Sequence, residues 1–129
     1  MIYLDSSVLL AHLLAEDRRP PEELWTEPLT SSRLLEYEIW TRVNARRMGE
    51  RLGEVVRLLL DRLAMLGLER PVLARAREPF PVPVRTLDAI HLASADFLRD
   101  RGQEVAVATY DARMKDAARA LGFELYPLE

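Results

Sequence analysis

The chain has 129 residues, of which 49% are hydrophobic and 30% charged, and this balance predicts one globular domain spanning residues 1–129. It has no cysteine and two histidines, which excludes disulfides, thiolate metal sites and cysteine nucleophiles and argues against a histidine-based zinc site. The net charge of −3 argues against nucleic-acid binding by the whole surface, but not against a local basic patch. The apolar run at 8–15 is too short to span a membrane and lacks the basic residues that precede a signal sequence, so we expect a cytoplasmic protein with no membrane partner.

In the first half of the chain, short apolar runs that favour strands alternate with longer helical patterns. Ser6 or Ser7 can cap the first helix, Ser31 or Ser32 can cap the third, and Gly67 can end the fourth. In chain order we predict a strand at 2–4, a helix at 6–16, a short helix at 22–26, a strand at 29–31, a helix at 33–47 and a helix at 51–66.

The second half begins with a proline-rich segment at 68–85 and then returns to alternating strands and helices. Thr86 can cap a helix, while Gly102 and Gly122 can each end one. In chain order we predict helices at 72–77 and 87–101, a strand at 104–109, a helix at 111–121 and a strand at 123–126. The alternation predicts an α/β fold, a three-layer α/β/α sandwich with a short, mostly parallel sheet of four or five strands.

Three acidic residues stand where a strand or loop gives way to a helix: Asp5, Asp88 and Asp111. In an open α/β sheet, ligands collect beyond the carboxyl ends of the strands, where such residues lie. Each also has a plainer interpretation, because an aspartate at a helix start caps the helix or complements its dipole. Asp5 and Asp88 adjoin strongly apolar elements, and this favours a role beyond capping for these two.

Two further acids, Glu36 and Glu38, lie within the helix predicted at 33–47. Glu38 shares a stripe with small and apolar side chains, which is unusual for an acid, and its plainer interpretation is an ion pair with Arg42 one turn later. Glu36 lies on another face, and helical periodicity does not choose between the two. If several carboxylates meet, they need a counter-charge, and oxygen ligands without cysteine favour Mg²⁺ or Mn²⁺ over Zn²⁺.

Four segments occur in an order and spacing that is more specific than any one of them. They are Ile2–Ser7, Ser31–Glu38, Leu87–Ala93 and Ala108–Arg113, and the trailing Ala117–Gly122 also fits. Together they resemble the PIN-domain ribonucleases, and most closely the VapC-type toxins of bacterial toxin–antitoxin pairs. In that family the glutamate is the eighth residue of the second segment, which selects Glu38 over Glu36. The matches extend from residue 2 to residue 122 and so cover nearly the whole chain.

The resemblance implies a catalytic acidic cluster that binds Mg²⁺ or Mn²⁺. Its members would be Asp5, Glu38, Asp88 and Asp111. Ser6 or Ser7 and Thr109 would support the cluster as hydrogen-bond partners. His91 recurs in similar sequences, but we assign it to packing because it lies one turn inside an apolar helix.

The implied activity is that of an endoribonuclease, which hydrolyses RNA phosphodiester bonds with water activated by the metal. Arg42, Arg46 and Arg85 could hold flanking phosphates, with solvated helix faces as the alternative for each. The family also implies a homodimer and a cognate antitoxin protein. The alternatives are a non-catalytic PIN-like module that binds a metal or a protein, and a DNA-directed nuclease. A phosphatase with Asp5 as nucleophile is disfavoured, because Ser7 stands where its second acid would be.

Overall fold

The computed structural model describes residues 1–14 and 17–129, and in this part of the chain five parallel strands form one sheet. The strands are β1 (Ile2–Leu4), β2 (Leu29–Ser32), β3 (Ala64–Leu66), β4 (Ala106–Ala108) and β5 (Glu124–Leu125). Their order across the sheet is β3-β2-β1-β4-β5, so β1 is central. In the register, Tyr3 lies opposite Thr30 on one side and Val107 on the other. The predicted α/β sandwich with a parallel sheet is confirmed.

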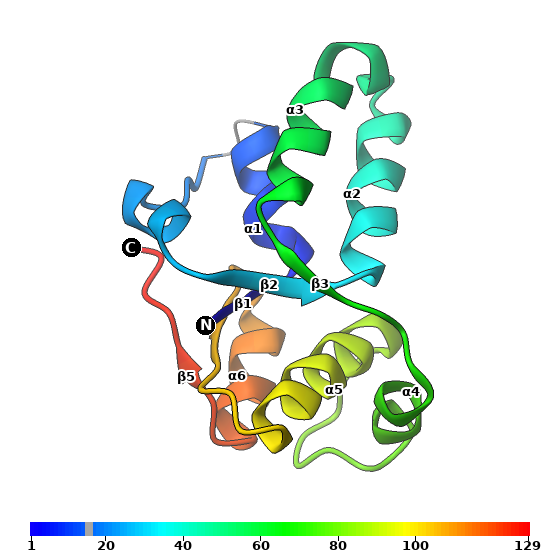
Figure 1. The fold of residues 1–129 in the computed structure, drawn as a ribbon, viewed down its shortest axis with the longest axis vertical. Helices are drawn as coiled ribbons and strands as arrows, with labels where there is room; N and C mark the ends of the chain where they lie inside the picture. Colours follow the sequence, from blue (N-terminus) through cyan, green and yellow to red (C-terminus); the bar gives the residue numbers. More distant parts are fainter. Residues whose placement is uncertain (15–16) are drawn as a thin grey trace.

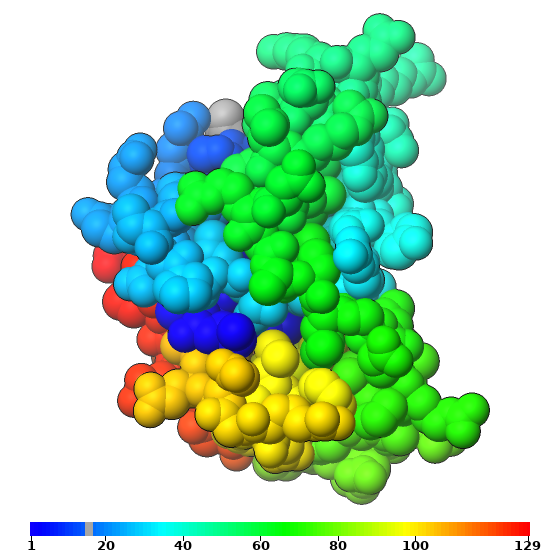
Figure 2. All heavy atoms as spheres, viewed as in Figure 1, coloured from blue at the N-terminus to red at the C-terminus, as the bar shows by residue number. Residues whose placement is uncertain are grey.

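Helices cover both faces of this sheet (Figure 1). They are α1 (Ser6–Leu13), the 3₁₀ helix η1 (Glu22–Thr26), α2 (Leu34–Ala45), α3 (Gly49–Asp61), α4 (Arg70–Ala76), α5 (Thr86–Asp100) and α6 (Ala112–Ala120). The first three α-helices lie on one face and the last three on the other (Figure 1). Figure 2 shows that the hairpin of α2 and α3 projects from one end of the molecule. None of the helices in the described ranges is long and apolar enough to cross a bilayer.

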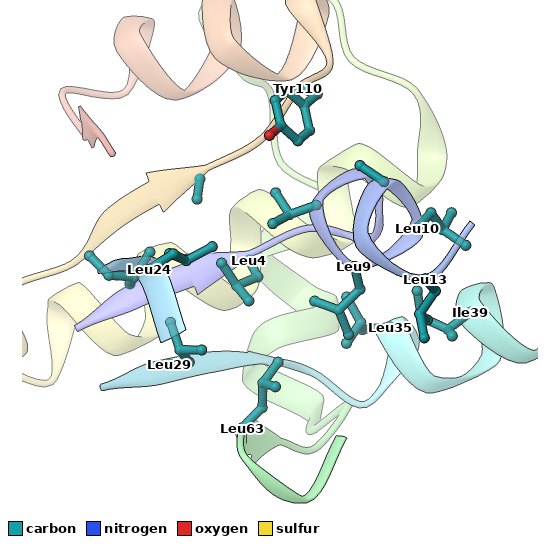
Figure 3. Packing of buried hydrophobic residues seen from close by; sticks show 14 of the residues in the cluster. Leu4, Leu9, Leu10, Leu13, Leu24, Leu29, Leu35, Ile39, Leu63 and Tyr110 are labelled. Atoms are coloured by element: carbon teal, nitrogen blue, oxygen red, sulfur yellow. The ribbon is translucent and has the colours of Figure 1, made fainter. Parts of the chain in front are cut away.

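The hydrophobic core has two parts because successive side chains of a strand point to opposite faces of the sheet. Ile2 and Leu4 belong to the larger cluster, which packs beneath α1, α2 and α3 and is shown in Figure 3. Tyr3 points the other way, into a cluster with Leu92 of α5 and Val107 of β4. The central strand is therefore buried on both sides, and this fixes the position of the residue that follows it.

The predicted helix at 51–66 is wrong at its C-terminal end. The helix α3 ends at Asp61, and residues 64–66 form β3, which pairs with β2. The main-chain N–H of Arg33 donates to the carbonyl of Leu66, and the Thr30 hydroxyl donates to the carbonyl of Ala64. A run of three apolar residues suits a helix or a buried strand equally well, and here the free edge of β2 decides the outcome.

Two predicted helix caps also differ in the structure. Asp5, rather than Ser6 or Ser7, is the N-cap of α1, and its carboxylate accepts a hydrogen bond from the main-chain N–H of Ser7. Thr86 lies inside α5, whose N-cap is Arg85 with no side-chain capping bond. A carboxylate accepts from a backbone N–H more strongly than a hydroxyl does, which explains the first difference. The predicted helix at 6–16 ends at Leu13 in the structure, and positions 15–16 lie outside the described residues.

The remaining helix boundaries follow the sequence signals closely. The predicted cap of α2 is one residue too early, because the N-cap is Arg33 without a side-chain capping bond, although the hydroxyl of Ser32 accepts from the main-chain N–H of Leu34. Gly102 follows α5 with a φ of +88°, and Gly122 follows α6 with a φ of +83°. Residues with a side chain rarely adopt this backbone conformation, so both glycines end helices as predicted.

Candidate active site

Asp5 lies directly after β1, at the carboxyl end of the central strand, and is 6% exposed. Its Oδ1 accepts from the Ser7 hydroxyl at 2.6 Å and from the Ser7 main-chain N–H at 3.1 Å. Its Oδ2 accepts from the Thr109 hydroxyl at 2.6 Å. Burial raises the pKa of the Asp5 carboxyl, while the hydrogen bonds from Ser7 and Thr109 oppose this change. Asp5 is therefore a buried acid whose hydrogen-bond partners are neutral groups.

Thr109 joins the ends of β1 and β4. Its hydroxyl oxygen donates to Asp5 and accepts from the main-chain N–H of Asp111 at 3.0 Å. These two strands are neighbours in the sheet, but the chain continues from them into helices on opposite faces (Figure 1). This is the position in a doubly wound sheet where the strand order reverses and where ligands bind.

Asp88 and Asp111 lie at the start of α5 and α6, and Arg85 connects them. The Nε of Arg85 is 2.9 Å from Oδ2 of Asp88, and its Nη2 is 3.0 Å from Oδ2 of Asp111. Asp111 is also the N-cap of α6, because its Oδ1 accepts from the main-chain N–H of Met114. Partial burial acts to raise the pKa of Asp111, but the hydrogen bonds from Met114 and Arg85 outweigh it and lower the pKa.

Glu38, on α2, meets His91, on α5. Its Oε1 lies 2.6 Å from Nε2 of His91, whose Nδ1 lies 2.7 Å from the hydroxyl of Tyr3. Glu38 therefore pairs with a residue of the opposite helical layer, rather than with Arg42 of its own helix as the plainer interpretation predicted. Glu36 pairs with Arg33 on the surface.

His91 is buried, as its assignment to packing predicts, but packing describes only part of its role. Both ring nitrogens have polar partners, and one of these partners is a candidate metal ligand. The sequence contains a signal for this contact, because His91 follows Asp88 by three residues and so lies on the same helix face.

The predicted acids are thus linked by two sets of contacts at one end of the sheet. One set joins Asp5 through Thr109 to Asp111 and through Arg85 to Asp88, and the other joins Glu38 to His91. Within residues 1–14 and 17–129, no three histidine, aspartate or glutamate side chains are close enough together to hold a metal ion. The donors are carboxylate and hydroxyl oxygens, which fit a hard dication such as Mg²⁺ or Mn²⁺.

The supporting residues and the arginines differ in how closely they approach this site. Ser7 contacts Asp5 directly and also accepts from the Tyr110 main-chain N–H, whereas Ser6 has no such contact in the described structure. Arg42, on the projecting helix α2, and Arg46, which follows it as the C-cap, are both exposed, and both the phosphate-binding and the solvated interpretation fit them. The Tyr110 ring belongs to the hydrophobic core, and the guanidinium of Arg18 stacks on it at 4.8 Å.

The chain is an α/β domain with a parallel sheet and acids at the carboxyl ends of its strands. Comparison with known proteins shows its family. The PIN domain matches residues 2–120, and the chain belongs to the PIN domain family. It is 35% identical to Ribonuclease VapC47 of Mycobacterium tuberculosis over 130 residues, which cover 95% of this chain and 93% of that protein. It is 36% identical to Ribonuclease VapC46 of the same species over 125 residues, which cover 94% and 92% of the two chains.

Two solved structures have the same fold. The crystal structure of Mycobacterium tuberculosis VapC20, a sarcin–ricin loop cleaving toxin, superposes with a TM-score of 0.70 and 22% identity, over 98% of this chain and 100% of that one. A toxin–antitoxin complex from Klebsiella pneumoniae superposes with a TM-score of 0.68 and 17% identity, over 93% and 94% of the two chains. The expected PIN-like architecture is confirmed.

Proposed function

We propose that this protein is a Mg²⁺- or Mn²⁺-dependent endoribonuclease and the toxin component of a type II toxin–antitoxin system. The observation that carries the proposal is Asp5, a buried carboxylate at the reversal point of the sheet whose hydrogen-bond partners are all neutral. A buried anion without a cationic partner is costly, so a cation that binds there would be stabilising. Full-length relatives that are named as VapC ribonucleases support the same activity.

In this proposal the metal ligands and catalytic acids are Asp5, Glu38, Asp88 and Asp111. When bound, the ion would lower the pKa of water and offset the charge that develops on the phosphodiester. Ser7 and Thr109 hold both oxygens of Asp5 in a fixed orientation. Arg85 supplies positive charge beside Asp88 and Asp111, and the exposed Arg42 and Arg46 can contact phosphates farther along the RNA.

The proposed partners are a cognate antitoxin protein, which inhibits cleavage, and a second copy of the chain in a homodimer. The similarity to a toxin–antitoxin complex in fold supports the first. RNA is the proposed substrate, and the cytoplasm, where RNA is exposed, is the proposed compartment.

The test is cleavage of a labelled single-stranded RNA by the purified protein with added Mg²⁺ or Mn²⁺. We expect cleavage to stop with EDTA and to fall by ~10²-fold or more in Asp5→Ala and Asp88→Asn, because each removes a charge at the reacting centre. The control is Asp61→Asn, which should leave cleavage unchanged. Asp61 is an exposed acid at the end of α3, just before the edge strand β3.

The same assay separates the alternatives. Cleavage of a DNA strand of the same sequence at an equal rate would favour a DNA-directed nuclease. Binding of Mn²⁺ without cleavage of either strand would favour a non-catalytic module. Cleavage of RNA that persists in EDTA, or in Asp5→Ala, would overturn the proposed mechanism.

A further inference from the structure

A buried chain of hydrogen bonds connects the central strand to Glu38. Tyr3 of β1 is 0% exposed and His91 of α5 is 2% exposed. Their rings meet edge to face with centroids 5.7 Å apart, and the Tyr3 hydroxyl lies 2.7 Å from Nδ1 of His91. The other ring nitrogen, Nε2, lies 2.6 Å from Oε1 of Glu38. His91 thus has one defined polar partner on each side of its ring.

The chemistry of these partners favours one tautomer of His91. A phenol keeps its proton at neutral pH, so Tyr3 can donate to Nδ1. A carboxylate has no proton to give, so the short contact between Nε2 and Glu38 requires the proton to be on the imidazole nitrogen. A neutral imidazole with Nδ1 as acceptor and Nε2 as donor satisfies both contacts at once.

We propose that His91 is a positioning residue, whose tautomer is set by Tyr3 and whose Nε2–H holds the Glu38 carboxylate in place for metal binding. The inference rests on the proposed function, because it assumes that Glu38 helps to bind the ion. In metal sites, outer-shell residues orient the ligands by hydrogen bonds. His91 would orient Glu38 in this way through Nε2, while Tyr3 orients His91 through Nδ1.

The position of His91 in the fold gives this contact its effect. Glu38 is on α2 in one helical layer, whereas His91 is on α5 in the other layer (Figure 1). Asp88 lies one turn before His91 on α5, so the hydrogen bond from His91 fixes the position of Glu38 relative to Asp88. A fully buried residue of one layer thereby orients a partly exposed acidic side chain of the other.

The first test reads the tautomer in the metal-free protein. Long-range ¹H–¹⁵N NMR spectra at neutral pH should show a pyridine-type Nδ1 and a pyrrole-type Nε2 for His91, assigned against the spectrum of His91→Gln. In Tyr3→Phe the pyridine-type Nδ1 loses its donor, and we expect its ¹⁵N shift to move or the two tautomers to mix. A protonated Nδ1 in the wild-type ring would overturn the proposal.

The second test measures the affinity for Mn²⁺ alone by calorimetry. We expect His91→Leu to weaken binding by ~10- to 100-fold, as is common when an outer-shell partner is removed. His91→Gln keeps an N–H donor near the position of Nε2 and should recover most of the lost affinity. Leu92→Val is the packing control, because Leu92 is fully buried beside His91 on α5 but has no polar role, and its Mn²⁺ affinity should equal that of the wild type.

These outcomes separate the inference from the activity on which it rests. If His91→Leu and the wild type bind Mn²⁺ equally, or if His91→Gln is no better than His91→Leu, then His91 does not position Glu38, whether or not the protein cleaves RNA. If the tautomer and the Mn²⁺ series are as expected but RNA stays intact, the positioning role stands and the ribonuclease proposal fails.

Discussion

Arg85 and Asp111 stand 26 positions apart in the chain, and an ion pair of 3.0 Å joins them across the mouth of the site. Arg85 also contacts Asp88 at 2.9 Å, so one guanidinium neutralises two of the acids assigned to metal binding. The side chain of Arg85 is 56% exposed, and it can leave the acids without disturbing the core. If these acids bind a metal as proposed, Arg85 is an internal cation that would compete with the ion.

We therefore predict opposite effects of Arg85→Ala on two ligands. The affinity for Mn²⁺ should rise severalfold, because exposed ion pairs are weak and the competition they provide is modest. The affinity for RNA in the presence of metal should fall, because a phosphate contact is lost. Calorimetry with Mn²⁺ and a filter-binding assay with RNA measure the two effects.

The matched control for this prediction is Arg113→Ala. Arg113 is exposed and lies beside Arg85 and Asp88 in a pocket of about 400 Å³, but it forms no ion pair with the acids in the described structure. Arg113→Ala removes the same charge from the same region. Because Arg113 is not paired with the acids, this variant should leave the affinity for Mn²⁺ nearly unchanged. An unchanged or weaker affinity in Arg85→Ala would show that Arg85 does not compete with the metal.

Gly122 tests the fold independently of the site. Its φ of +83° lies in the left-handed region, and alanine there should lower the free energy of unfolding by about 1–2 kcal/mol. Gly67→Ala is the control, because Gly67 does not have a positive φ and an added Cβ would meet the movable end of the Glu69 side chain at 3.1 Å. Urea unfolding measures both variants, and equal losses would contradict the assigned role of Gly122.

Much of this architecture could be predicted because local signals in the sequence agreed with one another. The alternation of strands and helices, the glycines after α5 and α6, and the acid after β1 each need information from only a few neighbouring residues. The strand β3 could not be predicted in this way. Its three residues fit a helix by periodicity, and they form a strand because β2 offers a free edge from a distant part of the chain.

The site shows the same division between local and distant information. The positions of Asp5, Asp88 and Asp111 at element junctions follow from the sequence. The spacing of Asp88 and His91 places His91 on the face of the acids, but its contact with Glu38 crosses from one helical layer to the other and depends on how α2 and α5 meet. The two ion pairs of Arg85 likewise depend on how α5 and α6 meet, which only the folded chain determines.

Arg42 and Arg46 give a prediction that depends on salt. Arg42 is exposed on α2 and Arg46 is exposed at its C-cap. If each contacts one phosphate, replacing either by alanine weakens binding of all RNA sequences alike and lowers the salt slope by ~1. The measurement is RNA affinity against salt concentration in the Asp5→Ala background, so that the RNA stays intact. Arg119→Ala, near the far end of α6, is the control, and an equal loss of slope there would contradict a specific role for α2.

Asp5 gives the last prediction, which links stability to pH. Burial raises the pKa of this carboxyl in the folded state, so the folded protein binds the proton more tightly than the unfolded chain does. The stability that Asp5 contributes is then fully present below its unfolded pKa and is lost as the pH rises through its folded pKa. Asp5→Asn removes the buried charge and should unfold at a higher urea concentration than the wild type near neutral pH.

The advantage of Asp5→Asn should shrink as the pH falls, because wild-type Asp5 becomes protonated and the two side chains become alike in charge. The control is Asp116→Asn, which neutralises a side chain that is 72% exposed and should show no such trend. Added Mn²⁺ should stabilise the wild type and not Asp5→Asn, since only the charged carboxylate binds the ion. A variant that is less stable than the wild type at every pH would mean that the hydrogen bonds from Ser7 and Thr109 fully offset the burial of the charge.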